Sequence, residues 1–210
     1  RALDLLQILT DLNLSDIPYY SFKVGAVANC QNIIISNTGY TGEIGFELYM
    51  KKSDCVSIWE GLFSVDSMLE PIGLGARDTL RLEMGYCLYG NDINDKTSPI
   101  EANLSWIVNM NKDFIGKTMI VKHISEGVAN ILVGFIMNEK GIPRKGYDIV
   151  NDKGDKIGVV TSGTMSPSLR LGVGMGYVLM QESKIENFIY ILVRSKPIKA
   201  KIVKRPFYGK

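Results

Sequence analysis

The pattern of hydrophobic and polar residues changes character near residue 128. Before this point, apolar residues recur at helical spacing in some stretches and alternate with polar residues in others, which predicts a mixture of helices and strands. Ser53 is expected to cap the second helix. We expect helices over 2–14, 53–63, 73–85 and 114–125, strands over 24–29, 31–36, 46–50 and 104–108, an extended segment over 17–22 and an ordered loop over 86–102.

Short strands at close spacing fill the remainder of the chain. Turn residues at 140–143 and 152–154 separate them, and no convincing helical pattern interrupts them. Such a pattern predicts a small barrel or sandwich, and we predict an antiparallel barrel. The fold class is therefore α+β, with a partial α+β region over 1–127 and a β-barrel domain over 128–210. The expected strands are 131–137, 148–150, 156–162, 172–180, 189–194 and 198–203.

The turn and helix over 73–85 carry two arginines. Ala76 and Leu80 contribute to an apolar stripe, and Arg77 and Arg81 lie one turn apart on the neighbouring face. Buried guanidinium groups need carboxylates or a ligand with acceptor atoms. The pattern therefore leaves two interpretations open, a structural network of arginines with carboxylates or a ligand site.

The strand over 46–50 has two chemically different faces. Phe46, Leu48 and Met50 share one face, whereas Glu47 and Tyr49 share the other. The first face is suited to a core. The second places a carboxylate beside an aromatic ring, directly after a glycine-rich turn.

The composition excludes several kinds of chemistry. His123 is the one histidine, which removes most histidine-based catalysis and any multi-histidine metal site, so acid–base chemistry would fall to carboxylates or tyrosines. Cys30, Cys55 and Cys87 are widely spaced and fit neither a disulfide framework nor a metal site. This favours a reducing compartment. No apolar run is long enough to span a bilayer, so we expect a soluble protein that does not bind membranes.

A series of motifs stands in order along nearly the whole chain. None would suffice alone, but together they resemble the glycine cleavage T-protein family of aminomethyltransferases. The motifs are SNTGYTGEIGFE at 36–47, GLGARDTLRLE at 73–83, YCLYGNDI at 86–93, SPIEANLSW at 98–106, TSGTMSPSL at 161–169 and MGYV at 175–178.

The resemblance implies a folate-dependent transferase of glycine catabolism. In this family, a partner protein, the glycine cleavage H-protein, carries an aminomethyl group as a thioether on its lipoate arm. Tetrahydrofolate, a co-substrate, accepts the methylene carbon, and ammonia leaves. The chemistry needs no metal and no covalent enzyme intermediate. It needs a site that holds the pterin and stabilises a developing iminium cation.

The resemblance also implies two residues of a folate site, Glu47 and Arg77, and the chemistry of Tyr40 makes it a third candidate. Glu47 matches the family's folate-binding glutamate, and a carboxylate can accept the paired N–H donors of a pterin edge. Arg77 matches the substrate-binding arginine, whose planar fork suits a carbonyl or carboxylate. Tyr40 can pack its ring on the pterin or p-aminobenzoyl group. Asp92 and Glu101 are interpreted as structural, because their local sequences are typical of a turn and a helix start.

The chain departs from the family pattern at several points. Asn37 replaces a usual arginine, Ile44 a usual acidic or amide residue, and Asn103 a usual glycine, although asparagine can adopt the left-handed conformation. The resemblance covers only the later portion of the family. We therefore expect the catalytic aspartate upstream of Arg1, and little or no transferase activity from this chain alone.

Other functions are possible within and outside the family. A folate-binding module related to flavoenzymes that oxidise dimethylglycine or sarcosine would share the fold and much of the site. A non-enzymatic relative in iron–sulfur assembly would carry a cysteine motif that is absent here. The motifs at 86–93 and 98–106 favour the aminomethyltransferase. Nucleic-acid binding is not expected, because the aromatic-rich strand motifs of an RNA-binding sheet are missing.

The net charge of +2 is unevenly distributed along the chain. Residues 1–127 hold ten basic and sixteen acidic residues, whereas residues 128–210 hold fourteen and six. H-proteins are typically acidic, so we expect the basic barrel to receive this partner, with the polyglutamate tail of folate as a rival ligand. The basic residues near the end of the chain are Arg194, Lys196, Lys199, Lys201, Lys204, Arg205 and Lys210.

The expected compartment is the cytoplasm, or the mitochondrial matrix in a eukaryote.

Overall fold

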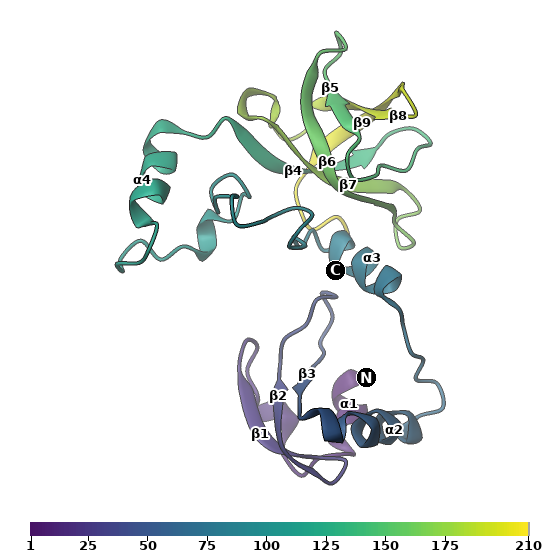
Figure 1. Ribbon diagram of the computed structural model, residues 1–210. Helices are drawn as coiled ribbons and strands as arrows, with labels where there is room; N and C mark the ends of the chain where they lie inside the picture. Colours follow the sequence, from purple (N-terminus) through teal and green to yellow (C-terminus); the bar gives the residue numbers. More distant parts are fainter. Residues whose placement is uncertain (210) are drawn as a thin grey trace. The chain divides into compact units, whose positions relative to one another are not determined.

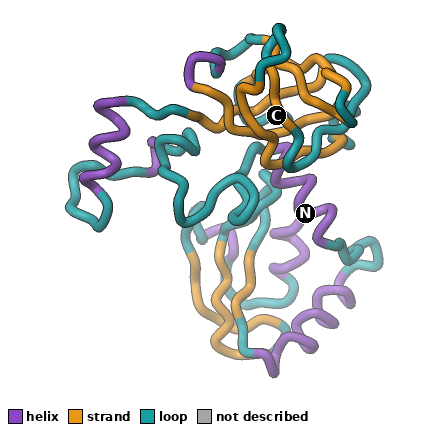
Figure 2. The backbone as a smooth tube through the Cα atoms, turned by 45° about the horizontal axis from the view of Figure 1, so that its top comes forward, coloured by secondary structure: helices purple, strands orange, loops and turns teal. Residues whose placement is uncertain are grey.

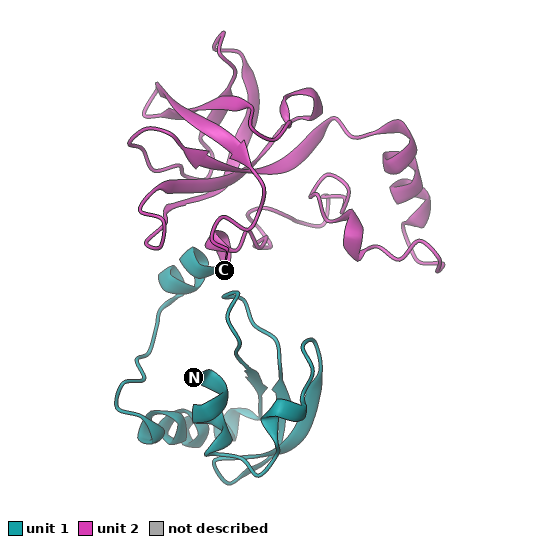
Figure 3. Ribbon diagram, turned by 180° about the vertical axis from the view of Figure 1, so that it is seen from behind, with its two compact units in different colours: residues 1–80 teal, residues 81–210 magenta. Residues whose placement is uncertain are grey.

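The computed structural model of the protein describes residues 1–209 and consists of two compact units, residues 1–80 and residues 81–210 (Figures 1 and 3). The first unit is α+β, and the second contains a closed antiparallel barrel. The predicted fold class is therefore confirmed. No helix of residues 1–209 is both long enough and apolar enough to cross a membrane.

The first unit is a three-stranded antiparallel sheet with helices on one face (Figure 2). Leu6 of α1 and Ile58 of α2 pack against Ile33 and Ile35 of β2, which are fully buried. The sheet order is β1-β2-β3. The elements are α1 (Ala2–Gln7), η1 (Leu14–Asp16), β1 (Phe22–Val27), β2 (Cys30–Ser36), β3 (Glu47–Tyr49), η2 (Lys52–Asp54), α2 (Cys55–Val65) and the first part of α3 (Leu74–Glu83).

The predicted parity of the third strand is correct. Phe46, Leu48 and Met50 all pack against the buried core of the first unit. Glu47 is half-buried, and Tyr49 is exposed on the other face. The alternation therefore separates a core face from a face that presents polar and aromatic groups.

Three local predictions in the first unit are wrong. The first helix ends at Gln7 instead of near residue 14. The segment over 17–22 contains a turn instead of running extended, because Tyr20 has a positive φ of 61° and its N–H donates to the Asn37 carbonyl. Ser53 does not cap α2, since its hydroxyl donates to the Asp54 side chain.

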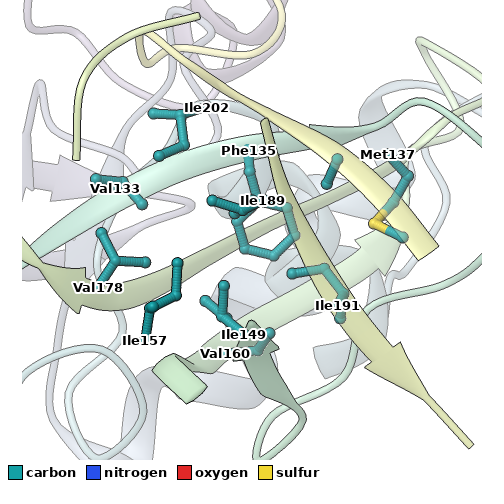
Figure 4. Close-up of a cluster of buried hydrophobic side chains, with 11 residues drawn as sticks. Val133, Phe135, Met137, Ile149, Ile157, Val160, Val178, Ile189, Ile191 and Ile202 are labelled. Atoms are coloured by element: carbon teal, nitrogen blue, oxygen red, sulfur yellow. The ribbon is translucent and has the colours of Figure 1, made fainter. Parts of the chain in front are cut away.

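The second unit is built around a six-stranded barrel in which every predicted strand is present. Its order is β4-β7-β6-β5-β8-β9, and all pairs are antiparallel. Inward side chains such as Phe135, Ile149 and Ile191 fill the interior without exposure (Figure 4). The strands are β4 (Asn130–Met137), β5 (Asp148–Val150), β6 (Lys156–Met165), β7 (Gly172–Leu179), β8 (Phe188–Val193) and β9 (Lys196–Val203), with η4 (Met180–Glu182) between β7 and β8.

The segment before the barrel contains little regular structure. Residues 86–102 form turns, as predicted, and α4 (Lys117–Glu126) corresponds to the predicted last helix. The predicted strand over 104–108 is wrong, because the backbone makes the 3₁₀ turn η3 (Ser105–Ile107) there.

The compact units divide the chain at a different place from the predicted domain boundary. The sequence predicts a boundary between residues 127 and 128, whereas the units meet between Leu80 and Arg81. Side chains of Arg81, Glu83 and Asp92 bond to barrel residues, which attaches their segment to the second unit. The grouping of 1–127 as one domain stays a prediction.

Candidate functional site

Glu47 is held at the start of β3 by the loop that precedes it. It pairs in register with Ser36 of β2, and its carboxylate accepts a hydrogen bond from the Thr38 hydroxyl. The Thr38 hydroxyl also lies 3.0 Å from Ser36 Oγ. This arrangement fixes one carboxylate oxygen on the face of the sheet opposite the core. A half-buried carboxylate so oriented is suited to accepting N–H donors from a ligand.

Tyr40 and Arg77 form a second part of the site. The guanidinium carbon of Arg77 lies 4.4 Å from the centre of the Tyr40 ring, which is cation–π geometry. Arg77 is exposed on α3, and Tyr40 is half-buried in the loop between β2 and β3. Two of the three predicted site residues are therefore in direct contact. That Glu47 joins them in one cleft stays a prediction.

A hollow of about 420 Å³ opens beside the same loop. Gly39 and Gly42, which flank Tyr40 and Thr41, contribute to its wall. Tyr40, Glu47 and Arg77 do not line it. Its lining residues are Leu3, Leu14, Ser15, Ile17, Tyr19, Asn37, Gly39, Gly42, Glu43 and Ile44.

Arg81 differs from Arg77 because its side chain is completely buried in the second unit. Its Nη1 donates to Asp92 Oδ2 at 2.7 Å and to the Tyr86 carbonyl at 2.9 Å, and its Nη2 donates to Ser162 Oγ at 2.8 Å. Asp92 is 1% exposed and also accepts from the Leu88 N–H. Here the structural interpretation of the arginine is correct.

Asp92 and Glu83 anchor the segment after α3 to the barrel. Asp92 accepts hydrogen bonds from the hydroxyls of Thr161 and Ser162 on β6. The buried Glu83 accepts from the hydroxyls of Ser166 and Ser168 and from the Ser168 N–H. Because these carboxylates are saturated with partners, they fit a structural role rather than acid–base catalysis.

Comparisons with known proteins assign the family. A family model described as the GCVT N-terminal domain matches residues 1–112, and one described as the glycine cleavage T-protein C-terminal barrel domain matches residues 131–209. The chain belongs to the glycine cleavage T-protein family. The predicted family is therefore confirmed.

Several relatives of this T-protein family are similar over nearly all of the chain. The aminomethyltransferase of Bacteroides fragilis is 55% identical over 99% of this chain, and that of Flavobacterium psychrophilum is 49% identical over all of it. A crystal structure of glycine cleavage system aminomethyltransferase T from Bartonella henselae has 32% identity and a TM-score of 0.91, and it covers 99% of this chain. The chain spans 57–59% of the length of these proteins.

Two departures from the T-protein pattern have structural explanations. Asn37 donates through Nδ2 to the Ile17 carbonyl at 2.7 Å, so the amide joins two segments of the first unit. Asn103 has a φ of 56°, which is the left-handed conformation that its replacement of glycine predicts. Ile44, by contrast, is 75% exposed, and nothing in the structure explains why an apolar residue stands there.

Sequence reasoning missed the serines that complete the buried network. Ser162 and Ser166 stand 81 and 83 residues from the side chains that they contact, Arg81 and Glu83. Their one signal was their place in the T-protein motif at 161–169. Glu101 lies in a turn instead of at the expected helix start, and its carboxylate accepts from the Ser98 N–H at 3.0 Å, so its structural role stays a prediction.

Titratable groups near this network are shifted by burial. Burial raises the pKa of Tyr177 well above its usual value of 10.0, and the Tyr177 hydroxyl donates to the Asp92 carbonyl. Burial likewise raises the pKa of the Cys87 thiol, so this cysteine is not an activated thiolate. His123 is half-buried on α4, and within residues 1–209 no three histidine, cysteine or carboxylate side chains gather to hold a metal ion.

Proposed function

We propose that this chain supplies the folate-binding face and the barrel of an aminomethyltransferase of the glycine cleavage system. Its membership of the T-protein family, with similarity along 99% of the chain, is the observation that carries the proposal. The contact between Arg77 and Tyr40 supports it, because two residues distant in sequence meet where a folate site is expected.

Glu47 is the proposed anchor for the pterin of tetrahydrofolate. The Thr38 hydroxyl bonds to Oε2, so the remaining oxygen and lone pairs of the carboxylate can accept the amide-like N–H groups of the pterin edge. Such a paired contact fixes the orientation of the ring. It therefore determines which ring nitrogen faces the aminomethyl carbon.

Tyr40 and Arg77 are the proposed second contact with folate. The ring of Tyr40 provides an aromatic surface for the pterin or p-aminobenzoyl group, and the stacked guanidinium offers planar N–H donors to a carbonyl or carboxylate. In the reaction, the bonds from the methylene carbon to the lipoyl sulfur and to the amino nitrogen break, bonds to two folate nitrogens form, and the protons of those two nitrogens pass to the departing sulfur and amino group. Ammonia and the lipoyl dithiol are released.

The barrel is the proposed docking surface for the lipoate-carrying H-protein. Arg194, Lys196 and Lys204 are exposed around β9. Ala200 and Ile202 of this strand are buried inside the barrel. An exposed positive edge would speed association with an acidic partner.

The basic surface is smaller than the sequence predicts. Lys201 pairs with Glu186 at 2.8 Å, and Lys199 lies 3.9 Å from the centre of the Phe188 ring. Arg205 points into the second unit, where its Nη1 donates to the Gly85 carbonyl. Lys210 lies outside the described residues. We therefore assign the docking role to Arg194, Lys196 and Lys204.

Binding of tetrahydrofolate to the whole chain tests the folate proposal. Glu47→Gln should weaken binding by about 1–3 kcal/mol, because a charge-assisted hydrogen-bond pair is lost. Glu43→Gln, in the same loop, is the matched control and should bind as the parent does. Titration calorimetry under anaerobic conditions measures both. If the two variants bind tetrahydrofolate equally well, Glu47 does not hold the pterin.

The salt dependence of H-protein association tests the docking proposal. Lys196→Glu with Lys204→Glu should slow association and flatten its dependence on salt, because exposed charges act over about 10 Å at 0.1 M salt. Lys153→Glu, in the turn between β5 and β6, is the control for a general change of charge. An association rate that ignores both salt and the paired substitution would contradict this role for the barrel.

A further inference from the structure

The side chain of Arg205 packs against two glycines of the second unit. A Cβ atom added at Gly85 would lie 2.7 Å from Arg205 Cβ, and one added at Gly134 would lie 2.8 Å from Arg205 Cγ. Gly85 also has a φ of 67°, a conformation that favours glycine. The aliphatic stem of Arg205 therefore occupies space that a larger residue at either position would fill. This packing fixes the direction in which the guanidinium points.

The inward nitrogen of this guanidinium contacts uncharged acceptors. Nη1 lies 3.4 Å from the Gly85 carbonyl oxygen, 3.4 Å from Met175 Sδ and 3.9 Å from Cys87 Sγ. Thioether and thiol sulfurs are weak acceptors. Burial raises the pKa of the Cys87 thiol, so at neutral pH the thiol keeps its proton and supplies no negative charge. These contacts hold the guanidinium in place without neutralising it.

No carboxylate of residues 1–209 neutralises Arg205. The side chain is half-buried, and none of the ion pairs formed in this part of the chain includes it. The buried Asp92 carboxylate is already paired with Arg81, at 2.7 Å. A positive charge that is partly removed from water costs free energy unless an anion compensates for it.

The other two nitrogens of Arg205 form a fork that reaches solvent. Nε and Nη2 make no hydrogen bond with the described residues. Neither nitrogen is buried, because His123 Nδ1 is the one buried side-chain nitrogen or oxygen without a partner in residues 1–209. In a guanidinium, Nη2 is trans to Cδ, so that one of its N–H groups is parallel to the Nε–H. This pair of donors matches two oxygens of a carboxylate or a phosphate.

We propose that Arg205 binds an oxyanion, a carboxylate or a phosphate group, through Nε and Nη2. Each nitrogen would donate to one oxygen of the anion, while Nη1 keeps its inward contacts. The anion would supply the missing negative charge, and the exposed Lys204 would add to its attraction. Two sources fit this chemistry, free phosphate and the glutamate carboxylates of tetrahydrofolate. The proposal does not rest on the pterin contact proposed for Glu47.

Nuclear magnetic resonance of the arginine side chains tests this proposal directly. The whole chain, labelled with ¹⁵N-arginine, is titrated with sodium phosphate that replaces sodium chloride at constant ionic strength. The Nε–H signal of Arg205 should shift and saturate. That of Arg170, an exposed arginine of the same unit, should not saturate. Signals of the two arginines that drift together without saturation would show that Arg205 is merely solvated, which overturns the proposal.

Titration calorimetry with a conservative variant separates the fork from its charge. Arg205→Lys keeps the positive charge but loses the paired donors, so phosphate should bind about tenfold more weakly. Arg170→Lys is the matched control and should bind phosphate as the parent does. Equal affinities of the two variants would contradict the proposal. The resonance titration of the parent needs no variant, so the test stands even if Arg205→Lys does not fold.

Two further ligands distinguish the sources of the anion. Acetate offers a bare carboxylate, and p-aminobenzoyl-glutamate offers the carboxylates of a folate tail without the pterin. Saturable binding of p-aminobenzoyl-glutamate that is tighter than that of acetate and phosphate would support the folate tail as the source. Tightest binding of phosphate would support free phosphate. If none of the three saturates the Arg205 signal, there is no oxyanion site. Because none carries a pterin, this result is independent of the test of Glu47.

Discussion

Arg77 and Arg81 lie one turn apart on α3, yet their surroundings differ completely. Arg77 is exposed and stacks on the ring of Tyr40 in the first unit. Arg81 is buried in the second unit and bonds to Asp92, Ser162 and the Tyr86 carbonyl. The same residue type at helical spacing therefore serves two purposes. One guanidinium remains accessible to a ligand, whereas the other is saturated by the protein.

The difference follows from what surrounds each arginine. Arg81 can be buried because the Ser162 hydroxyl of β6 and the Asp92 carboxylate compensate for the removal of its charge from water. The first unit is an open sheet whose outer face exposes Phe22, Val24 and Tyr49. In this unit Arg77 is exposed and Tyr40 is half-buried. This contrast separates the structural residues from the proposed binding residues more clearly than residue identity does.

The substitution with the largest expected effect on this contrast removes the buried Asp92 carboxylate. Asp92→Ala leaves Arg81 charged and unpaired inside the protein, which should lower the free energy of unfolding of the second unit by about 3–5 kcal/mol. Urea-dependent amide exchange of β6 and β7 measures this unit alone. Lys156→Ala, which breaks the exposed pair with Asp148, is the control and should cost about 0–1 kcal/mol. Equal costs for both variants would refute the structural role of Asp92.

A smaller effect is expected from pH. Because burial raises the pKa values of Cys87 and Tyr177 in the folded state, the unfolded chain loses these protons first as pH rises. Below the ordinary pKa values of 9.0 for Cys87 and 10.0 for Tyr177, these two groups leave the free energy of unfolding unchanged. As pH rises above those values, the free energy of unfolding falls. We therefore expect the free energy of unfolding of the second unit to fall above about pH 9.

Tyr177→Phe sharpens this pH test. It should cost about 1 kcal/mol at neutral pH, since it removes the hydrogen bond to the Asp92 carbonyl. It should also reduce the steepness of the fall above pH 10. The same pH profile in the variant and the parent would show that Tyr177 contributes nothing to the pH dependence of stability.

Sequence reasoning was most accurate where structure is determined locally. The barrel strands agree closely with prediction, because alternation and turn residues specify them, and Asn103 is left-handed as expected. The strand expected at 104–108 is wrong because the backbone makes a 3₁₀ turn there, which an apolar run alone does not distinguish from a strand. The sequence predicts that a buried Arg81 needs hydrogen-bond acceptors. No local sequence pattern identifies Asp92 or Ser162 as its partners.

The candidate site was likewise only partly predictable. Strand parity placed Glu47 on the face away from the core, and family resemblance named Glu47 and Arg77. Tyr40 was a candidate for its aromatic ring, and it is in contact with Arg77. The bond from Thr38 to Glu47 could not be foreseen, because it depends on how the loop of residues 37–46 folds back. Asn37 was noticed only as a departure, and its structural bond to Ile17 emerges from the tertiary fold.

The smallest predicted effect concerns the exposed arginine of the contrast. Arg77→Lys retains the positive charge but loses the planar group that stacks on Tyr40, so tetrahydrofolate binding should weaken about two- to fivefold, or about 0.5–1 kcal/mol. Arg170→Lys, an exposed arginine of the second unit, should bind as the parent does. If Arg77→Lys and Tyr40→Leu both bind tetrahydrofolate as tightly as the control, the stacked pair belongs with the structural residues. The contrast between Arg77 and Arg81 would then be one of exposure alone.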